Sequence, residues 1–501
     1  MIDTIHNALQ TILVHVLAWL HRRIQSSSWL LKVASKGWVQ PILQWSCRMK
    51  VLAVHREAAR HCPAYRSFLA KNGKGPISRW HEFTAVPVTT KENYVKPYTI
   101  ESRCYGGVIP TSGVIIDESS GSSGKPSNWV RGREEQRSVS KLLQNAYRQE
   151  YAGSKQLIVL NCFSLGVWAT GMNVTMSLAD IAIIKSIGPD KERLESTLRA
   201  FGPDYRYLIA GYPTFLKSFA DTTTLDLGDY DAHLVVGGEG MSEGFRTHLL
   251  QHYSSVRSSY GASDLEINIG AETAFTIGLR QACSKNTELC HRLFGRTTPP
   301  MIFQYNQADY YIETNEEGEL LFTIARSANI SPKIRYNLRD IGGVMSIKQL
   351  ESVLADQGID LADIAPVHSH LPLLYVFGRS DMTLSFYGAN IGAADIETVI
   401  SSDPQWVQDY SSFRLRIDED KQTAKQTLVI TLEMSENNAS YLPDTEAITQ
   451  AFLQRLTALN PDIREAVRLL SPDQFEVEVL DHGTGPFADH NNRQKHQYVL
   501  T

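Results

Sequence analysis

The sequence lacks the features that mark several protein classes. Its six cysteines are scattered without a C-x-x-C pair, which argues against a disulfide-stabilised fold and indicates a reducing compartment, the cytoplasm. Positive charge is not in excess, because 49 lysines and arginines stand against 54 aspartates and glutamates, so we expect no nucleic-acid partner. No internal repeat or low-complexity tract occurs. With 43% hydrophobic residues, the 501-residue chain can fold into two or more globular domains with a deep cleft.

Long apolar runs are also missing. The apolar stretch over residues 8–20 is interrupted by Gln10, Thr11 and His15, and it is shorter than the run of about 20 residues that a transmembrane helix needs. Tryptophans and aliphatic residues continue as far as Trp45. We therefore predict that residues 1–45 form a helical extension packed on the body of a soluble protein. A helix lying on a membrane surface is the alternative.

One cysteine–histidine cluster stands out. Cys283, Cys290 and His291 lie on the segment 280–293, which we predict to be a helix. Buried thiols explain the cluster better than a zinc site does, since the usual ligand spacing is missing.

Apolar runs alternate with helical patterns in the middle of the chain. This alternation predicts β-α-β units and an α/β, doubly wound, mainly parallel sheet in a large N-terminal domain. Beyond residue 301 the pattern changes to hairpins, at 310–314 and 319–325, which indicates a β-rich subdomain. The expected strands are 156–161, 181–187, 207–211, 234–238 and 256–260, and the expected helices are 191–201 and 245–253.

The last part of the chain predicts a small α+β unit. Its expected strands are 373–377, 382–387, 428–434 and 475–480, and its expected helices are 394–401 and 444–459. We therefore expect a large domain over residues 46–378 and a small C-terminal domain over residues 379–501, joined by a short hinge.

The densest chemical signal is a loop rich in hydroxyls and glycine. Glycines let the backbone N–H groups approach an oxyanion, hydroxyls donate hydrogen bonds, and a lysine adds a positive charge. The loop is not a Walker A motif, because its glycines are too close together and proline follows the lysine. A flexible linker is the alternative. The candidate phosphate-binding residues are Ser119, Ser120, Gly121, Ser122, Ser123, Gly124 and Lys125.

This loop resembles the S-S-G-T-T-G-K-P phosphate loop of adenylate-forming enzymes, the superfamily of acyl-CoA synthetases and adenylation domains. The nearest resemblance is to the phenylacetate–CoA ligase-like branch. It covers roughly residues 50–500. It implies that the protein activates a carboxylic acid with ATP and Mg²⁺ as an acyl-adenylate, and then transfers the acyl group to a thiol.

Further segments match the superfamily in order. Val236–Glu239 resembles its G-G-E turn, which implies that Gly238 and Glu239 edge the adenine pocket. The next segment resembles Y-G-x-[ST]-E, whose aromatic ring stacks on adenine and whose acid holds magnesium. Its residues here are Tyr260, Gly261, Ala262, Ser263 and Asp264. The acid is one methylene short, and Glu266 is a second candidate metal ligand.

Two motifs follow near the expected hinge. Arg335–Gly342 resembles Y-R-T-G-D-[LIV]-G, which implies that Asp340 binds the ribose hydroxyls. A carboxylate suits this role, because each oxygen can accept from one hydroxyl. The segment 378–381 resembles the G-R-x-D hinge motif, with Arg379 in contact with nucleotide and Asp381 at the hinge.

The resemblance also implies a pocket for the acid. Aromatic residues beside glycines suggest a slot for an aryl or arylacetic acid, or else for a medium-chain fatty acid. An ordinary core is the equal alternative. The candidate residues are Phe163, Trp168, Gly171, Tyr212 and Gly237.

The catalytic assignment ends at the C-terminus. In the superfamily a C-terminal lysine bridges the acid and the phosphate during adenylation; here Lys495 is the candidate, together with Lys125 and Asp264. The thiol is expected from CoA or a phosphopantetheinyl carrier protein. The alternatives are a stand-alone adenylating enzyme that serves a carrier protein or an amine, and a catalytically silent nucleotide-binding homologue. A homodimer is compatible with the sequence.

Overall fold

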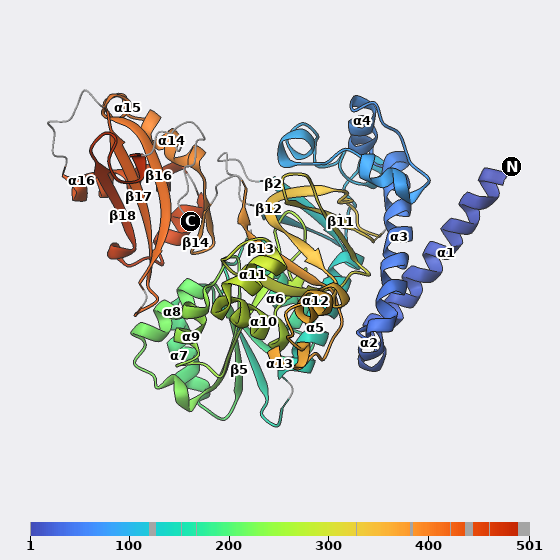
Figure 1. Cartoon of the computed structure of the whole chain (residues 1–501), viewed down its shortest axis with the longest axis horizontal. Coiled ribbons are helices and arrows are strands. Elements are labelled where there is room, and N and C mark those ends of the chain that lie inside the picture. Colours follow the sequence, from blue (N-terminus) through green and yellow to red (C-terminus); the bar gives the residue numbers. More distant parts are fainter. Residues whose placement is uncertain are drawn as a thin grey trace.

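The computed structural model is drawn in Figure 1. It describes residues 2–119, 127–151, 153–166, 168–326, 328–380, 384–420, 422–435, 444–459 and 461–488.

The chain begins with four helices. They are α1 (Ile2–Gln25), α2 (Ser28–Ala34), α3 (Gln40–His61) and α4 (Pro63–Lys71). The expected domain boundary at residue 45 falls inside α3, whose buried face packs against the body of the protein. Among the residues described, no helix has both the length and the hydropathy needed to cross a membrane.

A β-α-β region forms one half of the main sheet, as the sequence predicts. Two of its strands, Leu157–Asn161 and Arg206–Gly211, are buried on both faces, whereas the edge strand Ile183–Ser186 is largely exposed. The strands, in spatial order, are β4 (Ile183–Ser186), β3 (Leu157–Asn161), β5 (Arg206–Gly211), β6 (Asp231–Gly237) and β7 (Ser255–Tyr260), and all of them are parallel. The helices are α5 (Arg133–Tyr151), α6 (Ala169–Leu178), α7 (Lys191–Phe201), α8 (Pro213–Thr222) and α9 (Glu243–Leu249).

The expected β-rich subdomain is the antiparallel half of the same sheet rather than a separate sheet. Two-residue strand β8 pairs with β7 on one side and with β9 on the other, so the whole sheet has 11 strands. From β7 outward the order is β8 (Gly270–Ala271), β9 (Met301–Tyr305), β13 (Leu373–Arg379), β12 (Tyr336–Met345), β11 (Glu319–Ile324) and β10 (Tyr310–Thr314). The predicted hairpin is confirmed: β10 and β11 are joined by a turn in which Gly318 has a φ of +79°.

Helices of the antiparallel half show one difference from the sequence-based expectation. The predicted helix over 280–293 is two helices, α10 (Ala274–Lys285) and α11 (Thr287–Phe294), because Asn286 caps the second helix through its side chain. Cys283 and Cys290 are buried free thiols between these helices. Two further helices are α12 (Ile347–Ala355) and α13 (Leu361–Ile364).

A separate lobe follows β13 and lies at the opposite end of the molecule from α1 (Figure 1). The expected first strand of this lobe, 373–377, instead belongs to the large sheet as β13. Strand β17 pairs with β16 antiparallel and with β18 parallel. The elements are β14 (Leu384–Phe386), β15 (Ala389–Ile391), α14 (Ala393–Ser401), α15 (Pro404–Asp409), β16 (Tyr410–Glu419), β17 (Gln426–Met434), α16 (Thr445–Leu459), α17 (Pro461–Val467) and β18 (Phe475–Leu480).

Candidate functional site

The predicted phosphate loop joins the two strands of a hairpin. Strand β1 (Val114–Ser119) pairs antiparallel with β2 (Ser127–Gly132), and the register ends at Ser119 opposite Ser127. The hydroxyl of Ser119 is buried and accepts a hydrogen bond of 3.1 Å from the indole N–H of Trp129. The other predicted loop residues lie outside the described residues; they are Ser120, Gly121, Ser122, Ser123, Gly124 and Lys125.

Asp264 lies beside the base of this hairpin. Its carboxylate accepts hydrogen bonds from Tyr336 (2.7 Å) and Trp129 (3.2 Å), and the ammonium of Lys91 lies 3.3 Å away. Burial alone would raise the pKa of Asp264, but Lys91 together with hydrogen bonds from Ser119 and Tyr336 keeps the pKa below its ordinary value. The carboxylate is therefore ionised, and its orientation is fixed.

Glu266, the second candidate metal ligand, belongs to a different cluster. Tyr310 donates a 2.6 Å hydrogen bond to its carboxylate, Arg326 forms an ion pair with it, and Asn329 donates at 3.4 Å. The N–H of Ala262 donates a hydrogen bond to the carbonyl of Glu266 and closes a turn, so residues 264 and 266 do not lie on one side of an extended chain. Asp264 and Glu266 are not brought together as a metal site.

Tyr260 and Asp340 meet although they are far apart in sequence. The phenol of Tyr260, at the end of β7, donates a 2.5 Å hydrogen bond to the carboxylate of Asp340 on β12. Arg379 on β13 is the register partner of Asp340 and also acts electrostatically on Tyr260. The ring of Tyr260 stacks near that of Phe322, at a centroid distance of 6.1 Å. Three predicted nucleotide-binding residues thus form one cluster.

The predicted glycine turn follows β6. Gly238 has a φ of +84°, and a Cβ there would lie 3.0 Å from the ring of Tyr212. Glu239 accepts hydrogen bonds from the hydroxyl of Thr214 (3.0 Å) and from the backbone N–H of Gly388 (2.5 Å) in the C-terminal lobe. Burial raises the pKa of Glu239 to about 8. This side chain therefore joins the large sheet to the lobe.

The predicted acyl-pocket residues are brought together only in part. The rings of Phe163 and Tyr212 meet edge to face at 5.3 Å, and Gly237 lies next to Phe163. The backbone of Trp168 instead forms an isolated parallel β-bridge with Glu118 of β1. A Cβ at Gly171 would lie 2.2 Å from the carbonyl oxygen of Ser164, so this glycine permits close packing of the chain.

Two cavities lie apart from that pair of rings. A space of about 20 Å³ beside Ser263 is walled by Asp117, Arg131 and Glu135, and one oxygen of Glu135 has no hydrogen-bond partner. A larger cavity of about 270 Å³ lies between α1, α5 and residues 325–329. None of the predicted acyl-pocket residues lines either cavity, and the polar walls of the smaller one were not foreseen from the sequence.

The comparisons with known proteins concern the fold. No family model and no curated protein matches the sequence. A crystal structure of 2-hydroxyisobutyryl-CoA ligase, with 2-HIB-AMP and CoA in the thioesterification state, superposes with a TM-score of 0.63 at 16% identity, over 91% of this chain and 89% of that chain. The chain has the fold of an adenylate-forming ligase.

Other crystal structures of that ligase agree. A postadenylation state with R3-HIB-AMP gives a TM-score of 0.54 at 15% identity, over 91% of this chain and 89% of that one. An open conformation with 2-HIB-AMP and CoA gives 0.53 at 16% identity, over 91% of each chain.

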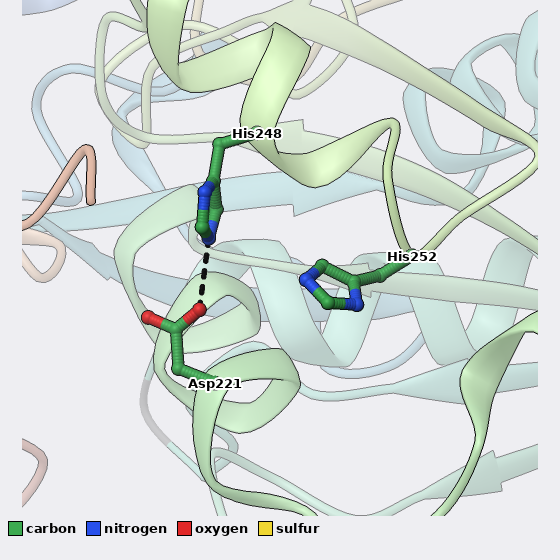
Figure 2. A group of neighbouring side chains, drawn as sticks. All are labelled: Asp221, His248 and His252. Atoms are coloured by element: carbon green, nitrogen blue, oxygen red, sulfur yellow. Dashed lines mark hydrogen bonds and ion pairs between the residues drawn. The ribbon is translucent and has the colours of Figure 1, made fainter. Parts of the chain in front are cut away.

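A potential metal-binding group lies away from Asp264, at the C-terminal ends of α8 and α9. Within the described ranges, Asp221, His248 and His252 are the only three histidine, cysteine or acidic residues whose ligand atoms all lie within 4.8 Å of one another (Figure 2). His248 is hydrogen-bonded to one oxygen of Asp221 at 2.8 Å, and the ammonium of Lys217 lies 2.5 Å from the other. Both oxygens of the Asp221 carboxylate are therefore engaged by neighbouring side chains.

The residues around Asp264 show what the sequence did not reveal. Lys91, Trp129 and Tyr336 surround this carboxylate, yet they come from three segments that carry no metal-binding pattern of their own. Tyr336 lies four residues before Asp340, inside the segment Arg335–Gly342 that resembles a superfamily motif. This resemblance was the one feature of the sequence that pointed to Tyr336 as a site residue.

Proposed function

We propose that the protein activates a carboxylic acid with ATP as an acyl-adenylate and transfers the acyl group to the thiol of CoA. One observation carries the proposal. Contacts of Asp264, which follows β7, join the base of the phosphate-loop hairpin to β12, and the Tyr260–Asp340 hydrogen bond joins β7 to β12 beside Arg379. These contacts between motifs that lie about 200 residues apart in the sequence, in a chain with the fold of an adenylate-forming ligase, support the proposal.

Different residues of the candidate site would bind the ribose, the phosphates and the Mg²⁺ ion of ATP. Asp340 accepts hydrogen bonds from the ribose hydroxyls, and the 120–126 loop with Lys125 holds the phosphates. Asp264 is the candidate ligand for Mg²⁺, which usually takes one or two carboxylates and otherwise phosphate oxygens and water. The low pKa of Asp264 fits this role. When bound, the ion would neutralise phosphate charge.

The C-terminal lobe contacts the large domain beside the predicted glycine turn. Glu239 contacts Gly388 of the lobe, and Ser242 at the start of α9 donates a 2.6 Å hydrogen bond to Glu419 of β16. These contacts place the lobe against the turn that carries Gly238. Asp381 and Lys495 lie outside the described residues; we propose them as the hinge and the adenylation lysine on the sequence motifs alone.

The acid is proposed from the resemblance to phenylacetate–CoA ligases. We place aryl and arylacetic acids first, and medium-chain fatty acids second. The edge-to-face contact of Phe163 with Tyr212 supports an aromatic environment near Gly237.

The test is ATP–pyrophosphate exchange with a panel of carboxylic acids and no CoA, followed by AMP release on addition of CoA. We expect exchange with one class of acid and CoA-dependent release of AMP. Exchange without any effect of CoA would assign the protein to the alternative, a stand-alone adenylating enzyme for a carrier protein or an amine. Nucleotide binding without exchange on any acid would contradict the proposal and indicate a silent homologue.

A further inference from the structure

Exposed tryptophans are concentrated at the N-terminal helices. The chain has eight tryptophans, and the four exposed ones all lie between residues 19 and 45. Trp19 is on α1, Trp29 on α2, Trp38 on the short helix η1 (Gly37–Val39) and Trp45 on α3. Trp29 and Trp38 are 69% and 71% exposed, although tryptophan is usually highly buried.

Further apolar side chains extend this exposure along α1. Ile12, Val16, Trp19 and Leu20 are exposed and recur at the spacing of one helix face. The other side of α1 is already packed: Val14 is buried, and Gln25 donates a 2.9 Å hydrogen bond to Asp309 of the main body. The exposed face is therefore not needed to hold α1 in place.

Helix α3 repeats this division. Ile42 and Trp45 are exposed, whereas Leu43 and Cys47 are buried against the body. Helices α2 and α3 both pack on α1, so the exposed residues belong to neighbouring elements. We name this set the N-terminal face; its residues are Ile12, Val16, Trp19, Leu20, Trp29, Trp38, Ile42 and Trp45.

The charge of these helices is unlike that of the rest of the chain. Residues 4–56 contain no aspartate or glutamate, although the whole chain has a net charge of −5. Exposed cations accompany the apolar residues, and the guanidinium of Arg23 lies 5.4 Å from the centre of the Trp19 ring. The exposed cations of this segment are Arg22, Arg23, Lys32 and Lys36.

We propose that the N-terminal face binds the surface of a membrane that contains anionic lipids. Tryptophan favours the interface between headgroups and acyl chains, and lysine and arginine are attracted by anionic headgroups. A long helix with one apolar face and flanking cations lies in the plane of such an interface. Charge complementarity favours this occupant over a second copy of the chain, since two such faces would bring like charges together.

The position of the face agrees with the proposed activity but does not depend on it. Helices α1 and α2 lie at the opposite end of the molecule from the C-terminal lobe (Figure 1). A membrane bound to this face would leave the C-terminal lobe accessible to solutes (Figure 1).

Co-sedimentation of the full chain with vesicles tests the proposal. The probes are vesicles of phosphatidylcholine alone, and vesicles that also contain about 30% phosphatidylserine. We expect binding to the phosphatidylserine vesicles that weakens with salt, and at least about tenfold weaker binding to phosphatidylcholine alone. Equal binding to both, or none to either, would overturn it.

Variants locate the binding surface. Trp29→Ala combined with Trp38→Ala should weaken vesicle binding about tenfold or more, and Lys32→Gln combined with Lys36→Gln should weaken it severalfold. The matched control is Phe201→Ala combined with Val407→Ala, which removes exposed apolar side chains elsewhere and should bind as the wild type does. Circular dichroism checks folding. The membrane assignment would be refuted if the Trp29→Ala, Trp38→Ala double variant bound vesicles as the wild type does. It would also be refuted if the wild type were a dimer and this double variant a monomer.

Discussion

Glu239 connects the main sheet to the C-terminal lobe, and its protonation should make stability depend on pH. Burial is the main cause that raises the pKa of this carboxyl group from 4.5 to about 8, against the opposing effect of hydrogen bonds from Gly388 and Thr214. Below pH 4.5 the group is protonated in both the folded and the unfolded chain. Between pH 4.5 and 8 only the unfolded chain ionises, so the folded state loses stability as pH rises.

The size of the effect follows from the two pKa values. Each pH unit in this window corresponds to about 1.4 kcal/mol. From pH 5 to pH 8 the folded state should therefore lose about 4 kcal/mol through this one group. Glu239→Gln cannot ionise, and its amide can still accept from Gly388, so the variant should not show this loss.

Thermal unfolding measured by scanning fluorimetry between pH 5 and pH 8 checks this prediction. The melting temperature of Glu239→Gln should be close to that of the wild type at pH 5 and clearly higher at pH 8. Glu397→Gln removes an exposed carboxylate from α14 and serves as the control, for which we expect no such divergence. Parallel pH profiles for the wild type and Glu239→Gln would refute the reasoning.

Further predictions concern the nucleotide site. Asp340→Ala should raise the KM for ATP in pyrophosphate exchange, since losing charge-assisted hydrogen bonds costs about 2–4 kcal/mol; unchanged ATP kinetics would show that the ribose assignment is wrong. Asp264→Ala should abolish Mg²⁺-dependent exchange. Glu266→Ala should leave the KM for ATP unchanged but lower the melting temperature, because buried Tyr310 and Arg326 each lose a hydrogen-bond partner at a cost of about 1–3 kcal/mol, while Arg326 keeps its ion pair with Asp309; the reverse order of severity would make Glu266 the ligand. Lys495→Ala should slow acyl-adenylate formation about 100-fold yet spare thioester formation from preformed adenylate, measured in separate single-turnover assays; equal loss in both would exclude that role.

The central parallel strands could be predicted because they are buried on both faces. The run over residues 157–160 is apolar throughout, and together with Asn161 it forms β3 in the structure. Helix α7 spans 191–201 as expected, since Asp190 caps its first turn and Gly202, with a φ of +73°, ends it. Strand β8 has only two residues and no pattern of its own, so the sequence could not show that both halves belong to one sheet.

The sequence predicted which segments form the candidate site, but not which side chains contact one another there. The hydrogen bond between Tyr260 and Asp340 joins two residues that the motifs had singled out. Lys91 and Trp129 approach Asp264 only because the sheet and the hairpin pack together. The sequence did not show that Glu266 lies apart from Asp264. A backbone hydrogen bond from Ala262 to Glu266 closes a turn there, and no residue type in this segment predicts that turn.

The position of β13 in the sheet has a consequence for synthesis of the chain. Strand β13 lies between β12 and β9, and it is the strand through which β10, β11 and β12 join the rest of the sheet. During translation, those three strands leave the ribosome before β13 does, so β12 keeps an open edge until β13 has also emerged. A ribosome that stalls before β13 has emerged would therefore hold a nascent chain whose parallel half can fold, but whose antiparallel half exposes a strand edge to chaperones and to other chains.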